Sequence, residues 1–275
     1  MSHCNLKWLT LYERDLDYLV ETACPEVSNK PRLKQIIRED EDFRNTLIGD
    51  EKVFRSVMDD EQIFLKISPT LFFEILLRNA AKDLEKASYT VEKTSTMRIP
   101  VFDTQDVVEL LSKESLLTYL ADMLSSFTKI QSYTISFRVR KGVWKNIRFN
   151  NLDILSLMSF CEAVEDEYRL GFYKRIADIC LFILGIFPEF AERDYRYPFS
   201  GEVRPFLRGK ARISPEGYEQ EGRKFYKLAA EHQSAVEHDL SEVFWMLYGN
   251  FQKAKKPLNF ISEHYLHYKR GRFFG

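Results

Sequence analysis

Apolar residues recur at helical spacing along most of this chain. A first stripe runs from Leu6 to Val20, and its helix is expected to end before Pro25. Further helical patterns cover residues 68–80, 103–111, 116–127, 152–167, 170–187, 214–229, 235–254 and 258–267. The pattern predicts a mainly α fold, a compact multi-helix domain that also holds one or two small antiparallel β-hairpins.

Three of these helices begin at a residue suited to capping. Ser68 and Ser214 each precede a proline, so the hydroxyl can accept a hydrogen bond from the first turn while proline occupies a position that needs no donor. Asp103 is expected to cap the helix that follows it in the same way.

The period changes from helical to alternating between residues 133 and 149. Polar residues separate the apolar ones, which is typical of β-strands that share one face. A three-residue loop, Arg140-Lys141-Gly142, gives the most consistent faces. It predicts that Tyr133 pairs with Phe149, Ile135 with Ile147, Val139 with Val143, Arg138 with Trp144 and Thr134 with Arg148.

A second, shorter stretch also alternates. Tyr89 and Val91 are expected to pair with Val101 and Ile99 across residues 94–96. Because an isolated hairpin is only marginally stable, an arrangement in which both hairpins join one small sheet is favoured.

Length and composition bound the class of protein. The chain has 275 residues, of which 45% are hydrophobic and 29% charged, and this apolar content is too high for a disordered chain. Its 11 glycines are too few for a collagen-like chain. We expect one mostly helical unit over 1–275. The alternative is two sub-units, an acidic helical half over 1–130 and a hairpin with helices and basic loops over 131–275.

The apolar stretches and cysteines indicate a cytoplasmic protein without a membrane span. The most apolar run, Ile176 to Phe187, has 12 residues where a bilayer needs roughly 20, so it predicts a buried core helix. Residues 1–15 lack the features of a signal peptide. The four cysteines form no C-x-x-C motif, and Cys161 and Cys180 are expected to be reduced core residues.

The usual short motifs of enzymes and metal sites do not occur. There is no Gly-rich phosphate loop, no G-x-S-x-G elbow, no H-E-x-x-H and no Glu-x-x-His. The His264 and His267 pair is interpreted as part of a polar aromatic tail. We therefore expect no cofactor and no metal.

Asp178 is the carboxylate that attracts most interest, because it lies inside the most apolar run. A buried aspartate must be paired or protonated. It would act as a perturbed acid in an enzyme, whereas in a structural role it would pair with Arg175 or with an arginine from elsewhere, such as Arg148. The structural role is favoured.

The net charge of −1 conceals an uneven distribution. Residues 138–148 carry +5, residues 196–212 carry +4 and residues 253–272 carry +5, so the rest of the chain carries −15. Aromatic residues interleave with the bases in all three segments. The candidate contacts for an anion or nucleic acid are Arg138, Arg140, Lys141, Trp144, Lys145, Arg148, Arg204, Arg208, Lys210 and Arg212.

The basic segments allow two interpretations. They can pair with acidic helices of the first half, where residues 13–62 hold 14 acids against 8 bases, within one subunit or across a dimer. They can also bind nucleic acid or another polyanion. The first is favoured.

Together these features predict a cytosolic, non-catalytic interaction or scaffold protein that acts through helical and basic surfaces. Its partner would be another protein or a second copy in a homo-oligomer. Two alternatives stay open: a nucleic-acid or polyanion binder that uses the three basic segments, and an enzyme without a recognisable local motif in which Asp178 is a buried carboxylate.

Overall fold

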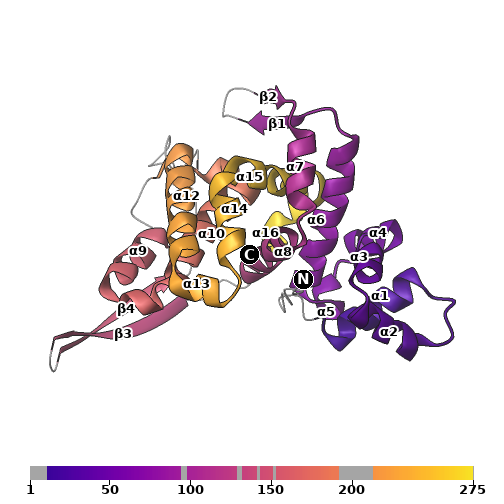
Figure 1. Ribbon diagram of the computed structural model, residues 1–275, viewed down its shortest axis with the longest axis horizontal. Coiled ribbons are helices and arrows are strands. Elements are labelled where there is room, and N and C mark those ends of the chain that lie inside the picture. The colour runs from indigo at the N-terminus through magenta and orange to yellow at the C-terminus, as the bar shows by residue number, and fades with distance from the viewer. Residues whose placement is uncertain are drawn as a thin grey trace. The chain divides into compact units, whose positions relative to one another are not determined.

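The fold is mainly α with two antiparallel hairpins, as the sequence predicts (Figure 1). The computed structural model describes residues 11–93, 98–128, 132–140, 143–150, 153–191 and 213–274, with backbone alone for 93, 98, 132–140, 143–150 and 268. The chain forms two compact units. Unit 1 contains residues 1–126 and 252–267, and unit 2 contains residues 127–251 and 268–275.

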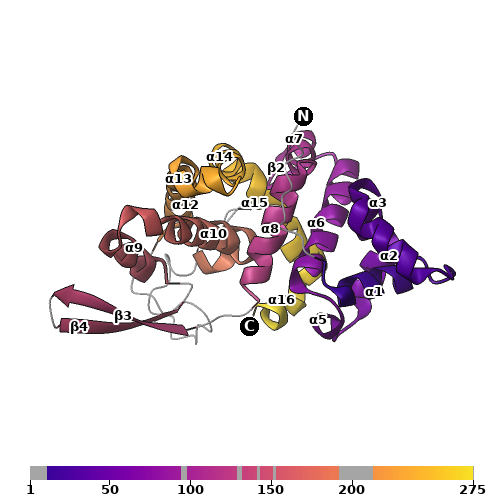
Figure 2. The same ribbon diagram turned by 60° about the horizontal axis from the view of Figure 1, so that its bottom comes forward.

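Unit 1 consists of short helices and a hairpin around the long helix α6. Its elements are α1 (Glu13–Ala23), α2 (Lys30–Glu39), α3 (Glu41–Ile48), α4 (Glu51–Asp59), α5 (Ile63–Lys66), α6 (Pro69–Lys86), β1 (Thr90–Lys93), β2 (Arg98–Val101), α7 (Thr104–Leu111) and α8 (Glu114–Ser126). The C-terminal segment adds most of α15 (Phe251–Phe260) and the π-helix η2 (Ile261–Leu266). Helix α6 packs against α7 and α8 and buries Leu71, Phe72 and Phe73 (Figure 2).

Unit 2 is organised around helix α10. Its elements are β3 (Ser132–Arg140), β4 (Val143–Asn150), α9 (Ile154–Ala163), η1 (Asp166–Tyr168), α10 (Leu170–Ile186), α12 (Pro215–Glu231), α13 (Gln233–Glu237), α14 (Ser241–Gly249), η3 (His267–Lys269) and α16 (Arg270–Phe273). Helix α10 packs against α9 and α12, and α12 also packs against α14. The prediction of a buried core helix is confirmed, because every residue from Ile176 to Phe187 is buried.

Two of the three predicted caps are confirmed. The Ser68 hydroxyl accepts a hydrogen bond from the Leu71 amide at 3.2 Å, and the Ser214 hydroxyl accepts one from the Gly217 amide at 3.1 Å. Asp103 occupies the N-cap position of α7, but its side chain makes no capping bond. The carboxylate instead accepts hydrogen bonds from the Thr90 hydroxyl and the Lys256 ammonium, so that prediction is wrong.

The predicted boundaries of the helices over 235–254 and 258–267 are wrong. The structure has three helices over this stretch, α13, α14 and α15, followed by η2. Asp239 has a φ of 57°, in the left-handed region that interrupts a helix, and α13 ends before it. Helix α15 then continues through Pro257, where a break was expected, and η2 follows it directly.

The β1–β2 hairpin forms with a register one residue away from the predicted one. Thr90 pairs with Val101, Val91 with Pro100 and Glu92 with Ile99. A slip of one residue exchanges the two faces of a strand. Thr90 faces inward because its hydroxyl binds Asp103, and Val91 is consequently exposed. The two hairpins form separate two-stranded sheets, which corrects the expectation of one shared sheet.

Candidate functional site

The β3–β4 hairpin is a paired ribbon of nine and eight residues that projects from the helices of unit 2 (Figures 1 and 2). Its register confirms the predicted pairs Tyr133–Phe149, Thr134–Arg148, Ile135–Ile147 and Arg138–Trp144. The predicted pair Val139–Val143 is wrong, and so is the three-residue loop, because Arg140 belongs to β3. Arg140 pairs with Val143 instead, and a register shift between Arg138 and Arg140 inserts the extra residue.

The register sorts the hairpin positions into two faces. Residues that pair across an antiparallel sheet share a face, and successive residues alternate between faces. Positions 133, 135, 147 and 149 share one face and are apolar. The other face contains Arg138, Trp144 and Arg148. The ribbon is therefore amphipathic.

Several predicted contact residues lie where side chains are not described. The backbone of Arg138, Arg140, Trp144, Lys145 and Arg148 belongs to β3 and β4, and their side chains lie outside the described atoms. Lys141 lies outside the described residues altogether. The same holds for the segment 196–212 and its candidates Arg204, Arg208, Lys210 and Arg212.

The third basic segment, 253–272, binds acids of its own chain. Within unit 1, Lys253 forms an ion pair with Asp106 at 2.7 Å, and the nearly buried Lys256 pairs with Asp103 and with Glu92, the latter at 3.1 Å. Within unit 2, Arg270 pairs with Glu189 at 2.9 Å. These three bases therefore form ion pairs within their own chain.

Asp178 is fully buried in unit 2, where its carboxylate accepts hydrogen bonds from a hydroxyl and from an ammonium group. Its Oδ1 accepts a hydrogen bond from the Tyr226 hydroxyl at 2.8 Å, and its Oδ2 accepts one from Lys174 Nζ at 2.8 Å. Lys174 and Tyr226 were not among the partners that the sequence suggested for Asp178. Lys174 stands one turn earlier on α10, whereas Tyr226 comes from α12. The carboxylate links the two central helices of unit 2.

The sequence reading missed a second buried carboxylate, Glu74 of unit 1. It is fully buried on α6, and its Oε1 accepts a hydrogen bond from Arg78 Nη2 at 2.8 Å. Arg78 also binds Asn45 and Glu114, so the cluster joins α3, α6 and α8. Burial raises the pKa of Glu74, and Arg78 offsets part of that rise. A glutamate between apolar neighbours with an arginine four residues later was the available signal.

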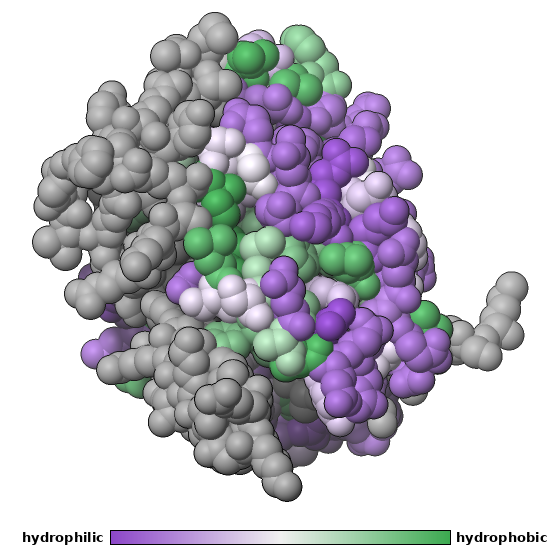
Figure 3. Space-filling view, turned by 90° about the vertical axis from the view of Figure 1, so that its left-hand side faces the viewer, coloured by the Kyte–Doolittle hydropathy of each residue, from purple (hydrophilic) through white to green (hydrophobic). Residues whose placement is uncertain are grey.

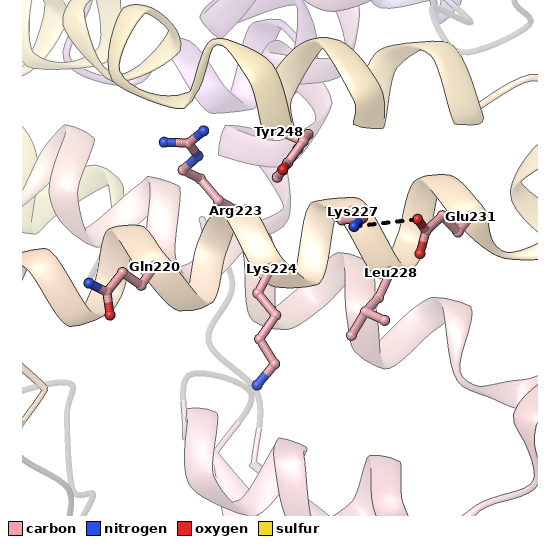
Figure 4. Close-up of a pocket in the computed structure, with 7 residues that line it drawn as sticks. All are labelled: Gln220, Arg223, Lys224, Lys227, Leu228, Glu231 and Tyr248. Atoms are coloured by element: carbon pink, nitrogen blue, oxygen red, sulfur yellow. Dashed lines mark ion pairs between the residues drawn. The ribbon is translucent and has the colours of Figure 1, made fainter.

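An open groove of about 520 Å³ crosses the outer side of α12 toward α14 in unit 2. It is lined by Gln220, Arg223, Lys224, Lys227, Leu228, Glu231 and Tyr248 (Figure 4). Arg223 and Tyr248 come from facing helices, and the guanidinium lies 5.5 Å from the ring centroid. No sequence motif marks this groove, because its residues come from two helices.

The coloured part of the face in Figure 3 mixes polar and apolar residues. In unit 2 the exposed large apolar side chains include Tyr168, Val236 and Trp245. Among the described residues no group of histidine, cysteine and carboxylate side chains could hold a metal ion. None of the described helices combines the length and apolar character needed to cross a membrane.

Comparison of the chain with protein-family models, with curated proteins and with solved structures finds no match.

Proposed function

We propose that this chain is a non-catalytic interaction protein of the cytoplasm and that the β3–β4 hairpin binds its partner. The observation that carries the proposal is the composition of this paired ribbon. Residues 132–150 contain three arginines and four aromatic residues and no Asp or Glu. Arginine and aromatic side chains are enriched at the centres of protein–protein interfaces, where acidic residues are depleted.

The charge of the hairpin defines the partner as a protein with an acidic surface. The five bases of 138–148 have no acid within either strand. Lys253, Lys256 and Arg270, by contrast, pair with carboxylates inside the fold. Residues 13–62 have an excess of acids, so a second copy of the chain is the first partner to test.

The environment of Asp178 supports a non-catalytic role. The carboxylate is buried between α10 and α12 and binds one cation and one hydroxyl. Lys174 and Tyr226 fix the position of this carboxylate, as expected for a structural ion pair.

The experiment measures the fluorescence anisotropy of a short labelled polyglutamate peptide titrated with the full chain. We expect binding that weakens as salt rises and that Arg138→Gln with Arg148→Gln reduces at least about tenfold, a loss of roughly 1.4 kcal/mol. Lys52→Gln with Arg55→Gln, two exposed bases on α4, is the matched control and should leave binding unchanged. Equal losses in both double variants would refute the proposal.

Nucleic acid is the second candidate partner, and the register favours it specifically. Arg138, Trp144 and Arg148 share one face, so bases for phosphates and an aromatic residue for stacking lie together. A two-stranded ribbon also fits the DNA major groove. Tight binding of labelled RNA or duplex DNA, with no binding of polyglutamate at equal salt, would select this function over the first.

A further inference from the structure

We infer that the groove between α12 and α14 is a docking site for an acidic protein segment that inserts an apolar anchor side chain. The groove does not depend on the hairpin, and different observations support it. We call this site the α12 groove; it is lined by residues 220, 223, 224, 227, 228, 231 and 248.

The charge of the α12 groove selects an acidic occupant. Arg223, Lys224 and Lys227 line it, against the single acid Glu231. Arg223 and Lys227 lie at positions i and i+4 of α12 and share one face, whereas Lys224 points to the other side of the helix from Arg223 (Figure 4). A segment with two or three carboxylates would match these cations.

Each of these cations pairs with an acid of its own helix. Arg223 lies 3.9 Å from Glu219, Lys227 lies 3.8 Å from Glu231 and Lys224 lies 3.2 Å from Glu221. Exposed pairs of this kind contribute little to stability, because water screens them and the side chains lose freedom. A bound carboxylate can therefore replace them at little cost.

Leu228 and Tyr248 supply the apolar part of the site, and both are partly exposed. Arg223 rises from α12 on the side of the Tyr248 ring, whereas Leu228 points to the other side of α12, as Lys224 does (Figure 4). Trp245, which is 42% exposed, lies beside Tyr248 with ring centroids 5.7 Å apart. Tryptophan, tyrosine and arginine are the residues most enriched at binding hot spots.

A peptide suits this geometry better than a nucleic acid. A peptide can place an apolar residue near Leu228 and keep its carboxylates beside the three cations, whereas a phosphate backbone offers no apolar side chain for that position. An open groove of about 520 Å³ has room for one or two side chains rather than an enclosed ligand.

The test uses a labelled amphipathic helical peptide that carries glutamates on one face and leucines on the other. Its affinity for the full chain is measured by fluorescence polarisation, in the background of Arg138→Gln with Arg148→Gln so that the hairpin does not contribute. We expect Arg223→Gln with Lys227→Gln to weaken binding at least about tenfold. Tyr248→Ala should also weaken it, because part of the apolar lining of the groove is lost.

Two controls separate the groove from non-specific attraction. Lys52→Gln with Arg55→Gln removes two exposed helical bases elsewhere and should not change the affinity. A peptide with glutamine in place of every glutamate should bind at least about tenfold more weakly. The inference is wrong if the groove variants bind as well as the parent, if both peptides bind equally, or if RNA of equal charge binds in their place. Since the hairpin is already disabled in this background, such a failure leaves the proposed function standing.

Discussion

At the scale of single residues, the buried carboxylates Asp178 and Asp15 each combine a partner close in the sequence with one far away in it. Asp178 binds Tyr226, which follows 48 residues later. Asp15, also fully buried, accepts hydrogen bonds from the backbone amides of Tyr12 and Ser68. The apolar setting of Asp178 made its burial predictable, but nothing local to it indicated Tyr226, because that contact depends on how α12 packs against α10.

The ion-pair role of Asp178 predicts a loss of stability on substitution. Asp178→Asn leaves Lys174 without its carboxylate, so the free energy of unfolding should fall by about 1–3 kcal/mol. Asp17→Asn is the matched control, since Asp17 pairs with Lys34 on the exposed surface and its loss should cost under about 1 kcal/mol. Urea unfolding measures both. Equal stability of the two variants would contradict the role assigned to Asp178.

Gly222 predicts a steric effect where helices approach closely. A Cβ at this position would lie 2.5 Å from Phe251 Cε2 and 2.9 Å from Cys180 Cβ. Gly222→Ala should therefore lower the unfolding free energy by about 1–3 kcal/mol. Gly171→Ala, on α10 with nothing within 4 Å, should be neutral or raise it by about 0.5–1 kcal/mol. Thermal unfolding compares them, and two variants with the same sign would be inconsistent with this packing.

Glu74 predicts a pH dependence of stability. Burial raises its pKa in the folded state, while Arg78 lowers it in part, so the folded chain keeps a proton that the unfolded chain loses above its ordinary pKa of 4.5. The contribution of Glu74 to stability should then decrease as pH rises from about 4.5 through the raised pKa. The difference in unfolding free energy between wild type and Glu74→Gln should fall over that range. Exposed Glu51→Gln should show no such slope, and a rising difference for Glu74→Gln would contradict the assignment.

At the scale of elements, side-chain contacts decide details that periodicity leaves open. The alternation over 133–149 was enough to predict both strands and four of the pairs, because one register alone aligns the apolar residues. It did not reveal the register shift between Arg138 and Arg140. The predicted register of β1–β2 was wrong by one residue. Thr90 faces inward to bind Asp103, and the pattern of apolar residues does not indicate that contact.

The anchoring of β1–β2 by Asp103 and Lys256 predicts a local effect. Asp103→Asn removes the carboxylate that binds both Thr90 and the nearly buried Lys256, so amide exchange in β1 should become faster and stability should fall by about 1–3 kcal/mol. Lys253→Met breaks only an exposed pair with Asp106 and should cost under about 1 kcal/mol. Hydrogen exchange followed by mass spectrometry reads both. Unchanged exchange in Asp103→Asn would show that the network does not hold the hairpin.

At the scale of the whole molecule, the C-terminal segment belongs to both units. Residues 252–267 complete unit 1, where Tyr265 donates a hydrogen bond to Asp83 at 2.7 Å. Residues 268–275 return to unit 2, where Phe274 is buried against Phe182 with ring centroids 5.0 Å apart. Helical periodicity predicted these helices but could not assign them to units, because long-range packing alone decides the assignment.

Truncation tests this sharing. A chain that ends at Phe251 loses a part of each unit, so amide protection should fall in α6 of unit 1 and in α10 of unit 2. A chain that ends at His267 keeps residues 252–267 and should lose protection mainly in α10. Hydrogen exchange resolves the two helices. Full protection of α6 in the shorter chain would contradict the shared architecture.

In the proposed function, the β3–β4 hairpin binds a protein partner through its bases and aromatic residues. The most direct measurement places a photo-reactive amino acid at Phe137, cross-links in cells that express the full chain, and compares the adducts with those of a chain that also carries Arg138→Glu and Arg148→Glu. We predict one discrete protein adduct, either a second copy or another protein with an acidic surface, that the charge reversal abolishes. An adduct pattern that the charge reversal leaves unchanged, or cross-links to nucleic acid alone, would contradict the claim.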